Sequence, residues 1–270
     1  MATRRRCLNC ETELRGEYCS ACGQRDLASR LAIGELIREI LSETFELDGR
    51  VWRTLIPFLF KPGALTHEYI AGRRVRYTSP FRLFLATTLL WLTTSLIAEQ
   101  LHDFEADAAD SDISVSIPTE DEDDSAMGEW LREHGAQLEE LSEAELAQLF
   151  WHTARETLPK SALLTIPVFA LLMKLLFIRQ DRYYVEHLVF ALHVHAFVFF
   201  ILAIGVLFEH DTVANVLSLV LLAYTYVALW RAYDARWWTS ALRLAALLFV
   251  HSIVLLLATM LMVLASMLLG

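Results

Sequence analysis

The sequence predicts a mainly α-helical fold, a polytopic membrane bundle of about five helices that follows a small cysteine-rich module and amphipathic juxtamembrane helices. Three observations support this prediction. Of the 270 residues, 55% are hydrophobic, which exceeds the usual fraction in a soluble domain. Many of the apolar residues gather in runs long enough to cross a bilayer. All the cysteines stand at the amino-terminal end, as two Cys-x-x-Cys pairs.

The cysteine module, residues 1–26, contains the best-defined chemical site. Its ligand candidates are Cys7, Cys10, Cys19 and Cys22. Two such pairs joined by a short loop can place four thiolates around one tetrahedral Zn²⁺, and four protein ligands leave no open position for catalysis. We therefore predict a zinc ribbon with one structural zinc ion per chain, although free or redox-active thiols are the alternative. Gly23 helps the backbone turn after the second pair, Asn9 is expected to adopt the left-handed turn conformation, and Leu14 and Tyr18 are the expected apolar cover.

Residues 27–79 form an amphipathic juxtamembrane segment. Apolar residues recur at helical spacing from 33 to 45, and a second helix is expected from Val51 to a break at Pro62-Gly63. The collar Arg73 to Arg76 is basic and directly precedes a long apolar run. Collars of this kind lie at the headgroup level, so we expect this one to contact anionic lipid. Lipid phosphate explains its charge more simply than nucleic acid, which is not expected as a partner.

The first predicted span covers residues 80–98, with Thr78 or Ser79 as its N-cap and Pro80 in its first turn. Residues 99–158 are an acidic loop: over 99–160 there are 18 Asp and Glu against 3 Lys and Arg. Residues 159–270 contain four further predicted spans: Ser161–Ile178, His187–Phe208, Thr212–Trp230 and Ser240–Leu261.

Arginines at the ends of these spans predict the topology. They fall in every second loop: Arg73, Arg74, Arg76 and Arg82, then Arg179 and Arg182, then Arg231, Arg236 and Arg243. By the positive-inside rule, the N-terminus lies in the cytoplasm, and the acidic loop and the C-terminus lie on the opposite side. No apolar segment of the signal-peptide type follows the basic start, so a secretory signal is not expected. The cysteines then lie in a reducing compartment, which favours metal over disulfide.

Histidines within the predicted spans are the next candidate site. At 100° per residue, His187 and His195 share a face with Tyr184, whereas His193 points nearly opposite. His195 and His251 lie at comparable depth, so they could meet as a proton relay, a metal pair or haem ligands. Hydrogen bonding to neighbouring helices is the favoured alternative, partly because no carboxylate lies deep in any span.

Several segments also resemble a known family. They are Cys7 to Cys10 with Tyr18 to Gln24, then Arg53-Thr54-Leu55, Lys61-Pro62-Gly63 and Glu68 to Pro80, then Tyr183 to Phe197. The resemblance is to the bacterial family of domain of unknown function 3667, whose members have a zinc-ribbon head. It implies an uncharacterised inner-membrane protein with the four cysteines as ribbon ligands. In such a membrane, the topology predicted from the arginines places the C-terminus in the periplasm. The resemblance implies no activity, cofactor or catalytic residue.

The predicted function is a non-enzymatic membrane protein whose cytoplasmic ribbon binds a partner protein, as an adaptor or as a redox or metal sensor. No Gly-rich phosphate loop, nucleophile triad or His-Glu-x-x-His helix is present, so an enzyme is not favoured. The alternative is a transporter or membrane enzyme that uses His195, His251 and Tyr184. The sequence does not identify a substrate, a partner or an oligomeric state.

Overall fold

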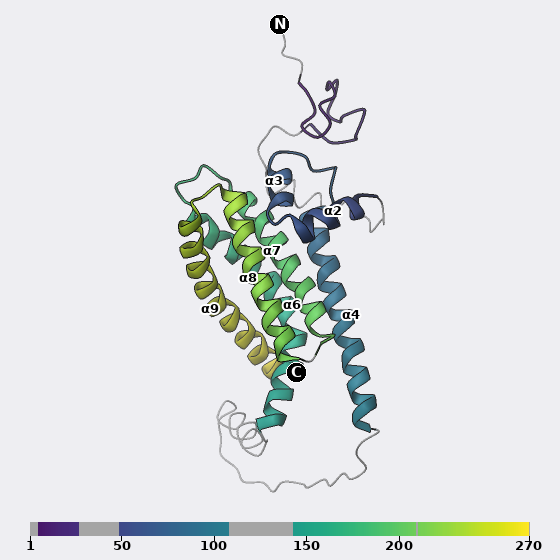
Figure 1. Cartoon of the computed structure of the whole chain (residues 1–270), viewed down its shortest axis with the longest axis vertical. Helices are drawn as coiled ribbons and strands as arrows, with labels where there is room; N and C mark the ends of the chain where they lie inside the picture. Colours follow the sequence, from purple (N-terminus) through teal and green to yellow (C-terminus); the bar gives the residue numbers. More distant parts are fainter. Residues whose placement is uncertain (1–4, 27–48, 108–142, 209, 270) are drawn as a thin grey trace.

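The computed structural model of the chain describes residues 5–26, 49–107, 143–208 and 210–269 (Figure 1). Within them the fold is helical, and the only β-pairing is two isolated bridges in the cysteine module. The helices are α2 (Gly49–Phe60), α3 (Ala64–Ile70), α4 (Pro80–Asp107), α6 (Glu143–Leu176), α7 (Tyr184–Gly205), α8 (Asp211–Tyr233) and α9 (Trp237–Leu269). The helix expected from 33 to 45 and residues 108–142 of the acidic loop lie outside the described residues.

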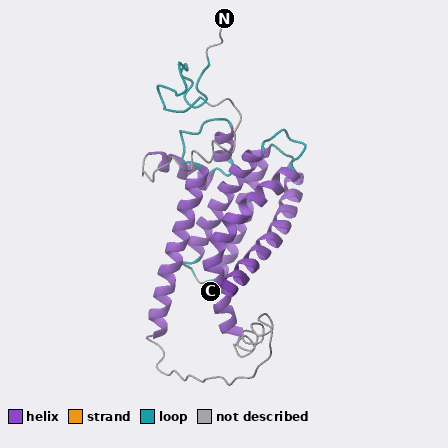
Figure 2. Ribbon diagram, turned by 180° about the vertical axis from the view of Figure 1, so that it is seen from behind, coloured by secondary structure: helices purple, strands orange, loops and turns teal. Residues whose placement is uncertain are grey.

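The five long helices run side by side, while α2 and α3 lie at the end of the bundle nearest the N-terminus (Figures 1 and 2). The cysteine module, called the head below, lies beyond them. Helix α7 occupies the centre and contacts α3, α4, α6 and α8. Apolar residues lie on all sides of α7, which suits a helix that other helices surround.

Four helices are long and apolar enough to cross a bilayer: Pro80–Ala98, Tyr184–Gly205, Thr212–Tyr233 and Trp237–Leu261. They coincide with four of the five expected spans and indicate a membrane protein. The count of five is corrected to four in the described chain. The remaining expected span, Ser161–Ile178, lies in α6, whose apolar part runs only from Ser161 to Leu176 and is therefore short for a full crossing.

Large apolar side chains cover the outside of the bundle. On α9, Phe249 and Leu256 are 69% and 66% exposed, and Leu219 on α8 is 65% exposed. Monomeric soluble proteins rarely present apolar surface on this scale. The outer faces of these helices therefore suit contact with lipid tails.

Helices α2 and α3 are anchored in the bundle by specific contacts. The hydroxyl of Tyr224 on α8 donates to the carbonyl of Phe58 on α2 at 2.7 Å, and the Phe58 ring packs edge-on against Phe197 of α7. Thr66 of α3 is hydrogen-bonded through its hydroxyl to Nδ1 of His193 on α7 at 3.0 Å, and both side chains are buried. The juxtamembrane helices are thus part of the packed core.

The start of α4 is also fixed to α2. The amide of Thr78 donates to the hydroxyl of Thr54 at 2.8 Å. Ser79 is the N-cap of α4, because its hydroxyl accepts from the amide of Arg82 at 3.4 Å and Pro80 is the first helical residue. Of the two expected caps, Thr78 and Ser79, the structure selects the second.

The turn between α2 and α3 approaches α8 closely at Gly63. Its φ of 80° lies in the left-handed region, and a Cβ placed on it would lie 2.8 Å from the carbonyl oxygen of Ala228. Only glycine satisfies both conditions without moving the helix or the turn.

We therefore expect Gly63→Ala to lower the free energy of unfolding by roughly 1–3 kcal/mol, since it adds backbone strain and a backbone clash. Thermal unfolding of the detergent-purified protein measures the effect. Gly49→Ala is the matched control, because no heavy atom lies within 4 Å of an added Cβ there. Equal unfolding temperatures for the two variants would contradict the close approach.

Candidate metal centre

The head consists of two turns of the same backbone geometry, twelve residues apart. In the first, the amide of Glu11 donates to the carbonyl of Cys7 at 2.8 Å, and in the second, the amide of Gly23 donates to that of Cys19 at 2.8 Å. Glu11 and Gly23 both have positive φ, 62° and 73°. The expectation for Gly23 is met, whereas the left-handed residue of the first turn is Glu11 and not Asn9. In each turn, the residue that follows the second cysteine donates its amide to the carbonyl of the first cysteine, and it is this residue that has positive φ.

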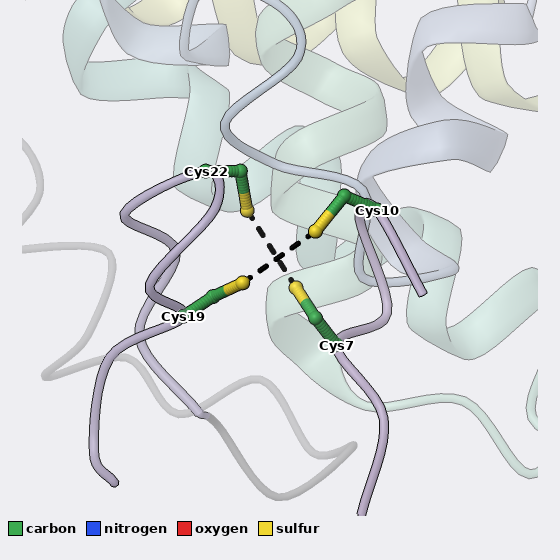
Figure 3. A group of neighbouring side chains, drawn as sticks. All are labelled: Cys7, Cys10, Cys19 and Cys22. Atoms are coloured by element: carbon green, nitrogen blue, oxygen red, sulfur yellow. Dashed lines mark hydrogen bonds between the residues drawn. The ribbon is translucent and has the colours of Figure 1, made fainter. Parts of the chain in front are cut away.

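These turns point four sulfur atoms at one another (Figure 3). Sγ of Cys7 lies 3.6 Å from Sγ of Cys22, and Sγ of Cys10 lies 3.5 Å from Sγ of Cys19. All four sulfurs lie within 4.8 Å of one another. Four thiolates at about 2.3 Å from a tetrahedral ion would be about 3.8 Å apart, so the site has the size that a single metal ion requires.

The sulfurs differ in environment. Cys7 and Cys19, the first residue of each pair, are buried, while Cys10 is exposed. Burial raises the pKa of the Cys7 thiol to about 11. Hydrogen bonds with the side chain and backbone of Thr12 lower the pKa of Cys10 to about 6. A metal ion would bind all four cysteines as thiolates and displace the protons that they still carry. Because the module has so little core, the bound ion would contribute most of its folding free energy.

The expected apolar cover of the head is wrong in one respect. Tyr18 is 61% exposed and covers nothing, although Leu14 is half-buried. The head packs instead against the collar: a Cβ on Gly72, which has φ of 87°, would lie 2.6 Å from Cδ1 of Leu8. The chain segment 72–75 therefore closes one side of the head.

Gln24 fastens the head to this segment. Its Nε2 donates to the carbonyl of Gly72 at 2.8 Å, and its Oε1 accepts from the amides of Arg74 and Val75 at 3.3 and 3.4 Å. The Gln24 side chain is only 7% exposed. Sequence reasoning assigned Gln24 no role because its partners lie about fifty residues away, and its only signal was its place directly after the second pair.

The collar arginines have partners within the protein. Arg73 forms a bidentate pair with Glu68, at 2.5 and 2.6 Å, which lowers the pKa of Glu68 and raises that of Arg73. The guanidinium of Arg74 lies over the ring of Tyr69, 5.4 Å from its centroid. Arg76 is the exposed member of the collar. The predicted lipid contact is therefore left chiefly to Arg76.

Two of the bundle histidines hold helices together. His193 binds Thr66 of α3, as described above, and Nδ1 of His187 lies 2.7 Å from the hydroxyl of Tyr233 on α8. These contacts match the favoured alternative, in which an imidazole hydrogen-bonds a neighbouring helix. Tyr184 does not join the histidines, because its hydroxyl donates to the carbonyl of Pro167 at 2.9 Å.

His195 and His251 are brought together by α7 and α9. Their rings meet edge to face with centroids 5.4 Å apart, and Phe169 of α6 packs against both, at 5.1 and 5.0 Å. Nδ1 of His195 donates to the carbonyl of Ala191 at 2.8 Å. A haem needs its two imidazoles on opposite faces of the macrocycle, so this perpendicular contact does not fit haem ligation.

Comparison with known proteins gives one family match. Residues 48–92 match the model of a family described as "Protein of unknown function (DUF3667)". The match covers α2, α3 and the first part of α4, which are the segments that join the head to the bundle. No curated protein and no solved structure matches the chain at a significant level.

In metal-free protein whose head is still folded, we expect iodoacetamide at pH 7 to alkylate Cys10 faster than Cys7. A thiol with a pKa of about 6 is mostly thiolate at that pH, whereas one with a pKa of about 11 is almost wholly protonated. Timed quenching and peptide mass spectrometry measure the order. With metal bound, all four cysteines should react slowly. Equal rates at Cys7 and Cys10 without metal would contradict the assignment.

Proposed function

We propose, on the premise that the chain belongs to this family of unknown function, that it is a multi-pass membrane protein whose metal-bound head is a docking module for a partner protein. The observation that supports this most directly is that four sulfur atoms are placed around a space for one metal ion, in a head that Gln24 ties to Gly72. The cage gives the head its shape, and the fastening fixes that shape at one end of the bundle. A head held in this way suits an adaptor or sensor.

Zinc is the metal that the donor set favours. Four cysteines without histidine or carboxylate suit Zn²⁺, and a closed tetrahedral site is structural. Disulfides do not fit the arrangement, because the sulfur pairs at 3.5 and 3.6 Å are far longer than a bond of about 2.05 Å. We infer a reducing compartment and therefore place the head in the cytoplasm.

The arginine distribution supports a bacterial inner-membrane topology with the N-terminus inside. Arg82 at the start of α4, Arg179 and Arg182 after α6, and Arg231 and Arg236 around the α8–α9 turn belong to the end of the bundle that the head occupies, because successive helices alternate in direction (Figure 1). This arrangement requires α6 to make the return passage. The C-terminus would then lie in the periplasm.

The free side of the head is the expected partner surface. Tyr18 is 61% exposed, and Glu11, Arg15 and Glu17 of the head are also exposed. Exposed tyrosines with polar neighbours are common anchors in protein interfaces. A sensor would use the same head: oxidation of its thiolates would release zinc, and the contact with residues 72–75 would carry the change to the bundle.

We expect replacement of all four cysteines by serine to abolish both bound zinc and copurification of the partner, since the head loses its shape. Tyr18→Ala should keep one zinc per chain and still weaken the partner at least about tenfold, while Arg231→Gln should leave both unchanged. Metal analysis and quantitative mass spectrometry of copurifying proteins measure these outcomes. A reporter at the N-terminus checks that each variant inserts with the head inside. A partner retained by the four-cysteine variant would refute the docking function.

A second candidate function is transport or catalysis within the bundle. The observation that favours it is the contact of His195 with His251, two ionisable side chains that meet inside apolar helices. A proton relay or a metal pair would require a ring nitrogen of each histidine to face the other side chain. Because Tyr184 lies elsewhere, it is not part of this site.

For that candidate, we expect His195→Ala or His251→Ala to abolish a cellular phenotype of the gene that Tyr18→Ala does not affect. His187→Ala is the matched control, since it removes a buried imidazole that hydrogen-bonds Tyr233 and lies outside the His195–His251 pair. Growth or stress tolerance of a deletion strain complemented with each variant measures the effect. Wild-type behaviour of both His195→Ala and His251→Ala would show that the pair only packs.

A further inference from the structure

A basic hollow lies where the head, α2 and the collar meet. Its volume is about 500 Å³, and it is lined by Asn9, Cys22, Arg50, Arg53, Val75 and Arg76. Three of these six residues are arginines with exposed side chains, and none of the described lining residues is acidic. Arg53 and Arg76 therefore give this open space local positive charge that favours an anion.

The hollow continues along α2. A second hollow of about 440 Å³ shares Arg53 and Arg76 with the first and adds Lys61. Its one carboxylate, Glu68, already receives the bidentate pair from Arg73. Arg53 and Arg76 therefore line both hollows, and the two hollows together are called the basic groove below.

An apolar stripe borders this groove. Trp52, Ile56 and Phe60 follow one another at four-residue spacing on α2 and are 73%, 61% and 76% exposed. Ile56 also lines the second hollow. The same short helix thus presents cations towards the head and large apolar side chains beside them, which is the pattern of a helix in a membrane interface.

We propose that the groove binds the phosphate group of an anionic lipid headgroup, with Arg53 and Arg76 as its principal ligands. A guanidinium matches phosphate with paired, charge-assisted hydrogen bonds. The acyl chains of that lipid would lie against the stripe of α2. Oδ1 of Asn9 is buried without a partner among the described residues and can accept from a headgroup hydroxyl. The lipid source rests on the proposed membrane topology, whereas the phosphate site does not.

A different account of the arginines is charge balance. Four thiolates around Zn²⁺ carry a net charge of −2, and nearby guanidinium groups would stabilise it without binding any ligand. The two accounts differ in what an arginine substitution changes. A phosphate site loses affinity for phosphate, while a purely balancing role loses retention of zinc.

The test uses the full chain with its metal, purified in a neutral detergent and titrated by calorimetry with dihexanoyl phosphatidylglycerol. Dihexanoyl phosphatidylcholine is the neutral lipid, and glycerol 3-phosphate is the soluble phosphate. The variant is Arg53→Gln with Arg76→Gln, and the matched control is Arg231→Gln with Arg236→Gln, which removes the same charge from the α8–α9 turn. Metal content and elution volume check that each protein is folded.

We expect wild type and control to bind phosphatidylglycerol with similar affinity, about tenfold or more tighter than phosphatidylcholine, and the variant to lose this preference. Weak binding of glycerol 3-phosphate would identify a lipid headgroup as the ligand. Equal binding of it would keep the phosphate site and assign it to a soluble compound. If the double variant does not fold, Arg53→Gln and Arg76→Gln alone should each show part of the loss.

The proposal is overturned if the variant binds phosphatidylglycerol as tightly as wild type, or if wild type does not distinguish the two lipids. Unchanged lipid binding together with faster zinc loss to a chelator would assign the arginines to charge balance. Neither result would affect the docking function, because that function is read from partner copurification with Tyr18→Ala.

Discussion

The packing of the α2–α3 turn against α7 and α8 is the constraint on which the rest of the structure depends. Gly63 reaches the carbonyl of Ala228, Tyr224 binds the carbonyl of Phe58, and Thr66 binds His193. These contacts fix the position of residues 61–79. Few contacts are described between the head and the bundle itself, and contacts with the segment from Gly72 to Val75 position the head. The family match at residues 48–92 falls on this connecting layer.

Local features were predictable from the sequence, and distant ones were not. The sulfur cage follows from ligand spacing within two short loops, and four spans follow from runs of apolar residues. The segment Ser161–Ile178 was expected to be a full span because Phe177 and Ile178 continue the apolar run beyond the end of α6 at Leu176. The left-handed residue of the first turn was assigned to Asn9 on propensity, yet the hydrogen-bond register of the turn places it at Glu11.

The partners of polar side chains required the fold. A glutamine after a cysteine pair has no preferred partner in sequence, and only the approach of Gly72 gives Gln24 its three hydrogen bonds. The same holds for the histidines. Helical periodicity placed His193 opposite His195, but it could not tell that one binds Thr66 while the other meets His251. Of the four imidazoles described above, two fasten helices, and the other two pack against each other and against Phe169.

The position of the metal cage has a consequence for the surface beneath it. A closed tetrathiolate centre is anionic, so an exposed cage beside a negatively charged membrane would be repelled from it. Arg53 and Arg76 line the hollows that also contain Cys22 and Ile56, so with metal bound they would lower that repulsion whether or not a lipid phosphate is bound. Loss of the metal together with protonation of the thiolates would lower the negative charge of the cage and disturb the wall that Asn9 and Cys22 contribute to the hollow. With zinc bound and the head next to a membrane, the state of the thiolates would therefore be linked to the electrostatics of the headgroup layer.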